Sequence, residues 1–251
     1  MAKYKKIIVA GPLVVETIYP APNPRDSEGV RSGKKALSSE AQRRMNWKYA
    51  YQKLELEIAA NFGENDLYIT LTYDEKHLPP DRKKANQRMQ AFWRRLRTAR
   101  RAMGKELRYI YVTEHKHGDG RWHHHVLLNA TGEDFVQIAR IWGQGLVDFK
   151  QIRVDRDRNY ETLARYLCKE QREALGARLW SCSRNLHKPE RECFRVPNDT
   201  PLTPPDGVMI LEDTGDVTTA YGHFRYLKYL ARGWNETRKP KAKRRRRRAN
   251  L

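Results

Sequence analysis

The chain has 251 residues, of which 39% are hydrophobic, and a formal net charge of +20 at pH 7. This length is enough for one or two domains with a buried core, and the charge indicates a polyanionic partner, most commonly a nucleic acid. No apolar stretch is long enough for a transmembrane helix, and the three cysteines lack a Cys-x-x-Cys pair, which argues against a disulfide framework or a zinc knuckle and fits a reducing cytosol.

Residues 1–65 are expected to form an N-terminal region of strands, a linker and a helix. The apolar stretch IIVAGPLVV predicts two strands joined by a Gly-Pro turn, although its basic flank leaves a short signal peptide open. Residues 21–37 are rich in Pro, Gly, Ser and charge, as is typical of an exposed linker. Ser39 and Gln42 form a capping-box pattern, which predicts a helix over about 40–61.

Residues 66–175 carry the clearest periodic patterns and are expected to form the main domain. The predicted elements are a strand at 67–73, a basic amphipathic helix at 82–105, strands at 107–114 and 122–128, a helix at 133–142, a strand at 146–154 and a helix at 160–175. The arginines of the basic helix either face solvent or face DNA.

The β-α-β-β-α-β order predicts an α+β fold with the ferredoxin-like, or RRM-like, split βαβ plan. In that plan the first and third strands lie at the centre of an antiparallel sheet, and both helices pack on one face. The helix that follows is expected to lie near the open face.

Three side chains of the central hairpin could hold a metal ion. With a side-chain period of two, His123 and His125 share one face of their strand, while His124 points to the other. Pairing with the preceding strand brings Glu114 near the two imidazoles. Two imidazoles and a carboxylate can bind a divalent metal and leave positions open for a substrate; partly exposed polar positions are the plainer alternative. Two histidines of the glycine-rich turn are not expected to be ligands: His115 and His117.

Glu114 also shares its strand face with Ile110 and Val112. Two apolar side chains on the open face require that this face is partly covered, or that a β-bulge shifts the register.

The helix after the last predicted strand offers a nucleophile. Tyr166 and Lys169 lie three residues apart, and Arg165, Lys169 and Arg172 form a basic stripe beside the phenol. Nearby cations favour the phenolate and provide a surface for a phosphate. An ordinary helix tyrosine without a catalytic role is the alternative.

The remainder of the chain gives weaker patterns. Residues 176–235 form a C-terminal region of unclear role, with two short strands predicted around Asp213 to Gly215. Basic and aromatic residues interleave from Tyr221 to Arg232, a composition that suits either stacking on single-stranded bases or packing against the domain. Residues 236–251 form a basic tail, expected to be disordered and to contact phosphates unless it is simply a solvated tail. Its central arginines include Arg244, Arg245 and Arg246.

Three segments, LYITLTYDE, GRWHHHVLL with Glu114 upstream, and ARYLCKE, resemble in the same order the three motifs of the HUH endonucleases. The resemblance covers roughly 66–175 and is closest to the rolling-circle replication initiators of plasmids and small single-stranded DNA phages. It implies that His123, His125 and Glu114 hold Mg²⁺ or Mn²⁺. It also implies that Tyr166 attacks the scissile phosphate, leaving a 5′-phosphotyrosine and a free 3′-hydroxyl, and that Lys169 steadies the phosphate or the metal site.

The resemblance further implies contacts to single-stranded or replication-origin DNA, for which Arg121, Arg165 and Arg172 are candidates. Two positions depart from the family pattern. His124 replaces a bulky hydrophobic residue, so a register with His124 as ligand stays open, and Thr162 stands where some phage members have a second tyrosine, which favours a one-tyrosine enzyme.

A relaxase or a one-tyrosine transposase would use the same chemistry, and a non-catalytic RRM-like nucleic-acid-binding module or a non-haem iron oxygenase are alternatives from other classes. The chain has no Gly-x-x-x-x-Gly-Lys-Ser/Thr loop, so a separate helicase and a DNA polymerase are expected as partners. No membrane partner is expected, and the expected compartment is the cytoplasm of a bacterial host.

Overall fold

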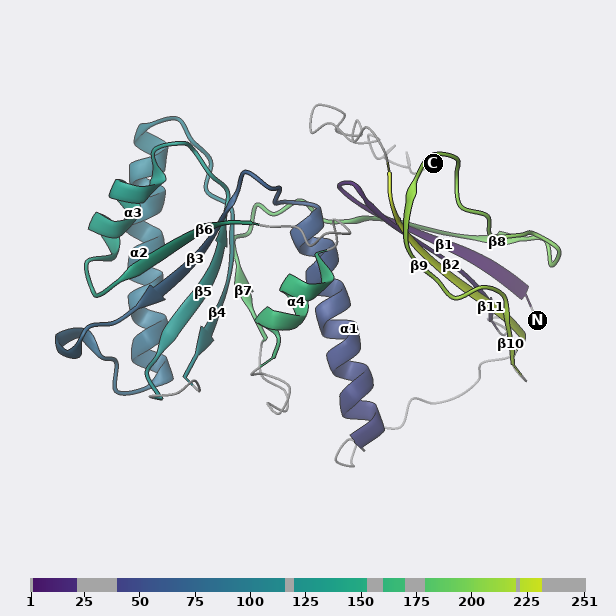
Figure 1. Ribbon diagram of the computed structural model, residues 1–251, viewed down its shortest axis with the longest axis horizontal. Helices are drawn as coiled ribbons and strands as arrows, with labels where there is room; N and C mark the ends of the chain where they lie inside the picture. Colours follow the sequence, from purple (N-terminus) through teal and green to yellow (C-terminus); the bar gives the residue numbers. More distant parts are fainter. Residues whose placement is uncertain are drawn as a thin grey trace, which may run out of the picture.

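The computed structural model describes residues 2–21, 40–115, 120–152, 160–169, 179–219 and 222–231. These residues form two antiparallel sheets with α-helices packed on and between them (Figure 1), so the predicted α+β class is confirmed. None of the helices in the described ranges combines the length and the apolar character needed to cross a membrane.

The main sheet has the predicted split βαβ topology. Its strands, in spatial order, are β6 (Val147–Gln151), β3 (Leu67–Thr72), β5 (His123–Leu128), β4 (Tyr109–Glu114) and β7 (Ser181–Cys182). All neighbouring pairs are antiparallel. The first and third strands of the predicted plan, β3 and β5, therefore lie side by side at the centre, as expected. The short strand β7 extends the sheet beyond β4.

Helices α2 (Arg82–Ala102) and α3 (Asp134–Trp142) cover one face of this sheet (Figure 1). The apolar stripe of α2 is buried against it: Met89, Phe92, Trp93 and Leu96. Asp81 caps α2 by accepting a hydrogen bond from the backbone N–H of Lys84, and Gly143 ends α3 in the left-handed region with φ of 54°. A short 3₁₀ helix, η2 (Glu75–His77), follows β3.

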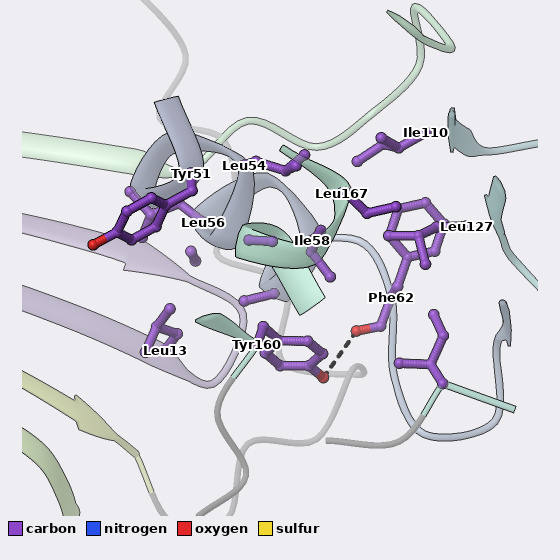
Figure 2. Close-up of a cluster of buried hydrophobic side chains, with 14 of the residues drawn as sticks. Leu13, Tyr51, Leu54, Leu56, Ile58, Phe62, Ile110, Leu127, Tyr160 and Leu167 are labelled. Carbon is purple, nitrogen blue, oxygen red and sulfur yellow. Dashed lines mark hydrogen bonds between the residues drawn. The ribbon is translucent and has the colours of Figure 1, made fainter. Parts of the chain in front are cut away.

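The opposite face is partly covered by α1 (Glu40–Ala59) and α4 (Glu161–Leu167). Figure 2 shows the cluster of buried side chains that joins these helices to the sheet: Leu54 and Ile58 of α1, Leu167 of α4, Ile110 of β4 and Leu127 of β5. The Tyr160 hydroxyl donates a hydrogen bond to the carbonyl oxygen of Phe62 at 3.0 Å. The β4–β5 ladder keeps one register along its length. Partial cover, rather than a bulge, thus accommodates the apolar side chains beside Glu114.

A second sheet is built from both ends of the chain. Its strands run in the order β10 (Val217–Thr219), β11 (Gly222–Leu230), β2 (Leu13–Ala21), β1 (Ala2–Ala10) and β8 (Glu190–Val196), and β9 (Met209–Asp213) also pairs with β11. The predicted N-terminal strand pair is confirmed. The two strands predicted near Asp213 are also present, but each pairs with β11.

Most element bounds agree with the predictions within three residues, but α4 is shorter than the predicted 160–175. The helix ends at Leu167, because the Lys169 N–H donates to the Tyr166 carbonyl at 3.2 Å and tightens the chain into a turn. Several predictions fall outside the described residues: the linker, the Ser39 cap, His117, Arg172, Tyr221, and the tail with Arg244, Arg245 and Arg246.

Candidate active site

The main sheet brings the three predicted metal ligands together. His123 and His125 point to the face that α4 approaches, and Glu114 lies directly opposite His123 in the β4–β5 ladder. One ligand atom from each of the three residues lies within 4.8 Å of the other two. The Glu114 Oε2 atom is 3.5 Å from His123 Nε2 and 3.4 Å from His125 Nε2.

The buried polar atoms at this point fit a divalent cation. Both carboxylate oxygens of Glu114 and the Nε2 atom of His125 are buried and have no hydrogen-bond partner among the described residues. Burying polar atoms without partners is unfavourable, and a cation bound between them would satisfy all three.

The other ring nitrogens are engaged in ways that leave Nε2 available. The Nδ1 atom of His123 lies 3.1 Å from the carbonyl oxygen of Arg121, which can only accept, so Nδ1 carries the proton and Nε2 keeps its lone pair. The Nδ1 atom of His125 lies 2.7 Å from the Tyr68 hydroxyl and 3.3 Å from Thr70 Oγ1. Such outer contacts orient metal-binding imidazoles.

The charge of Glu114 is also suited to a cation. Burial acts to raise the pKa of this carboxyl, but the two imidazoles and the Lys169 ammonium outweigh burial and hold the pKa at about 2. Glu114 is therefore a carboxylate at neutral pH.

His124 has a different environment. Its side chain is fully buried on the opposite face, where Nε2 lies 2.8 Å from the Tyr73 hydroxyl and Nδ1 lies 2.9 Å from Thr113 Oγ1. Burial, with the neighbouring histidines, lowers its pKa to about 3. His124 is thus a neutral core histidine with both nitrogens engaged, and it does not belong to the ligand cluster.

Tyr166 reaches the same site from α4. Its ring meets that of His125 edge-on at a centroid distance of 5.4 Å and that of Tyr68 at 6.5 Å, and the residue is 40% exposed. The Lys169 Nζ atom lies 3.8 Å from the centroid of the Tyr166 ring. Tyr166, Lys169 and the two histidines line a common open cavity of about 1150 Å³. The structure therefore places a solvent-accessible phenol, an ammonium and the ligand cluster around one space.

The two described arginines of the predicted DNA-binding set have different positions. Arg121 lines the cavity, where Nη2 donates to the Tyr73 carbonyl at 3.0 Å and Nη1 pairs with Glu75. Arg165 lies against α1 instead: its guanidinium pairs with Glu161 at 2.6 Å and stacks over the ring of Tyr51. Arg165 is not among the residues that line the cavity.

Sequence reasoning missed several residues of the site. Tyr68 and Thr70 lie on β3 beside His125, and Trp122 and Leu146 line the cavity rim. The period of two could have found Tyr68 and Thr70, because alternate residues of LYITLTY must face the histidine side once β3 and β5 are neighbours.

Residues 66–171 match a family model of replication-associated proteins, the ORF2 type. The matched segment contains β3, α2, the hairpin with all three candidate ligands, and α4 with Tyr166 and Lys169. No curated protein and no solved structure matches the chain significantly. The part of the chain that forms the candidate site is therefore similar to replication-associated proteins.

Proposed function

We propose that this protein is a replication initiator that nicks and rejoins single-stranded origin DNA in rolling-circle replication, with a tyrosine as nucleophile and a divalent metal as cofactor. The observation that carries the proposal is the position of Tyr166 beside Glu114, His123 and His125, within a segment similar to replication-associated proteins.

The three ligands would hold Mg²⁺ or Mn²⁺, which polarises the scissile phosphate when bound. Tyr166 Oη attacks phosphorus in line, the bond to the 3′-oxygen breaks, and the DNA 5′ end remains on the protein as a phosphotyrosine. The departing 3′-oxygen takes up a proton and becomes a hydroxyl that can prime synthesis. Joining is the reverse reaction, in which a 3′-hydroxyl displaces the phenolate of Tyr166.

Lys169 and Arg121 supply the positive charge around the reaction. The Lys169 ammonium next to the phenol ring favours the phenolate and offers a point charge to the phosphate. Arg121 lines the same cavity from the residues directly before the histidine strand, where it can contact the DNA backbone.

In this proposal residues 66–175 form the nicking domain, residues 1–65 and 176–235 flank it, and 236–251 is a phosphate-binding tail with Arg244, Arg245 and Arg246. Arg165 and Arg172 are expected to contribute to DNA binding from the region of α4. A separate helicase and a DNA polymerase would complete replication in the cytoplasm of the bacterial host.

The test is formation of a covalent adduct. The protein is incubated with Mn²⁺ and a pool of labelled single-stranded oligonucleotides, denatured and run on a gel; wild type should form an adduct, and Tyr166→Phe and chelated samples should not. A relaxase or transposase would give the same adduct on other DNA sequences, whereas a non-catalytic binding module would give none. Absence of an adduct with every metal tried, or an equal adduct with Tyr166→Phe, would refute the proposal.

A further inference from the structure

The second sheet has an uncovered region on the side that faces α1. Figure 1 shows β8, β1 and β2 side by side, with α1 near the end of β1 and β2 that holds their connecting turn, while the rest of the strands runs away from the helix. Near α1 the inner positions are buried, as for Ile8 and Val15. Farther along, the same face carries partly or fully exposed side chains.

Cross-strand pairing places these side chains in rows. In the outer row, Tyr4 of β1 lies between Arg195 of β8 and Tyr19 of β2. In the next row, Lys6 lies between Cys193 and Thr17, and the following row begins with Arg191 opposite Ile8. We call Tyr4, Lys6, Tyr19, Arg191 and Arg195 the β1 patch. The rings of Tyr4 and Tyr19 are nearly parallel, with an interplanar angle of 24° and centroids 6.2 Å apart.

Charge is divided between the two faces of this sheet by strand parity. On the face opposite the β1 patch, Lys5 pairs with Glu16 at 2.6 Å, and Glu190 and Glu192 alternate with the arginines of β8. The β1 patch holds only basic charges. Within the described residues, Lys6, Arg191 and Arg195 form no ion pair with an acid.

The basic and aromatic run at the end of the chain does not provide an equivalent surface. Tyr229 and Lys228 are buried, and Lys228 lies between two carboxylates, at 2.6 Å from Glu161 and 3.2 Å from Glu55. Arg225 pairs with Asp213 at 2.8 Å. Packing, rather than base stacking, is thus the role of these described residues. An accessible combination of aromatic and basic side chains lies instead on β1, β2 and β8.

We infer that the β1 patch is a second binding surface for single-stranded DNA, separate from the cavity around Tyr166. Bases would stack on the rings of Tyr4 and Tyr19, and phosphates would contact Lys6, Arg191 and Arg195. Aromatic rings on a sheet with basic side chains around them are the usual means of binding single strands without sequence readout. Duplex DNA hides the faces of its bases and could use only the charges.

The first test is oligonucleotide binding by full-length protein in EDTA, so that nicking does not contribute. Fluorescence anisotropy with a labelled 30-mer of thymidine is measured at several salt concentrations. Tyr4→Ala with Tyr19→Ala should weaken binding about tenfold or more without changing the salt dependence. Lys6→Gln with Arg195→Gln should reduce the slope of log K against log salt by about 1.4, since each phosphate contact to a single strand contributes about 0.7.

A matched control removes the same charge elsewhere. Arg101→Gln with Lys105→Gln changes two exposed basic residues next to the end of α2. An equal loss of affinity and slope in this control would show that only net charge matters and would overturn the inference. An equal effect of the tyrosine variant on a duplex of the same length would overturn it as well.

A second test needs no substitution, so it does not depend on variants that fold. Cys193 is exposed and lies beside Lys6 of the β1 patch, with its sulfur 3.3 Å from the Tyr19 hydroxyl, whereas Cys168 is buried. Saturating thymidine 30-mer should slow the modification of Cys193 by a maleimide several-fold, as read by mass spectrometry. An unchanged rate at saturation would overturn the inference. Both tests are independent of adduct formation, so the failure of one proposal leaves the other standing.

Discussion

A buried charge cluster connects the second sheet to the tyrosine helix and allows a quantitative prediction. Lys228 of β11 lies between Glu55 of α1 and Glu161 at the start of α4, and the side chains of Lys228 and Glu55 are each 3% exposed. Burial raises the pKa of Glu55 to about 7, although the nearby Lys228 opposes the rise.

The perturbation is Glu55→Gln, which keeps the shape of the side chain and removes its titration. Because the folded pKa of Glu55 lies above its ordinary value of 4.5, wild type has its full stability from this group below about pH 4.5 and loses it as pH rises through 7. At about 1.4 kcal/mol for each pKa unit, the difference amounts to about 3 kcal/mol. The Gln variant lacks this loss, so its stability relative to wild type should rise by that amount between pH 4.5 and 8.

Urea denaturation followed by circular dichroism at pH 5, 6, 7 and 8 gives the free energy of unfolding of both proteins. Glu57→Gln is the control, since Glu57 lies on the same helix but its side chain is 21% exposed. Parallel pH curves for wild type and Glu55→Gln, or the same change in Glu57→Gln, would refute the reasoning about the buried cluster.

Three further predictions concern stability. Arg100→Met should lower the free energy of unfolding by about 3–5 kcal/mol in urea, because it leaves the Asp134 carboxylate buried without its cation at 2.7 Å; a loss below about 1 kcal/mol would contradict this. Gly11→Ala should lower the thermal midpoint, since φ is 58° and a Cβ would lie 2.2 Å from the Ala59 carbonyl oxygen; an unchanged midpoint would count against the turn geometry. Mn²⁺ at about 100 times its Kd should stabilise wild type by about 2.7 kcal/mol and leave Glu114→Gln unaffected, and equal stabilisation of both would place the metal elsewhere.

The main sheet could be predicted from sequence because its signals are local. Alternation assigned His123 and His125 to one face and His124 to the other, and the order of strands and helices then gave the sheet topology. The position of Ile110 and Val112 beside Glu114 correctly indicated that the site face is partly covered.

The second sheet could not be predicted because its pairing is long-range. Residues Lys3 to Val9 of β1 pair with Glu190 to Val196 of β8, and no local pattern specifies such a partner. The charges were equally hidden: Lys228 in an aromatic and basic run looks exposed in sequence, and only the packing of β11 against α1 and α4 reveals that it is buried. The β1 patch likewise exists only once β8 is placed beside β1.

The most direct test of the central claim is to locate the bond between protein and DNA. The adduct formed with Mn²⁺ and single-stranded DNA is digested with protease and nuclease, and the peptide that carries the remaining nucleotide is sequenced by tandem mass spectrometry. The geometry of Tyr166 beside Glu114, His123 and His125 predicts a phosphodiester on the phenol oxygen of Tyr166 and on no other residue. Attachment to Tyr160 or to any other side chain would contradict this account.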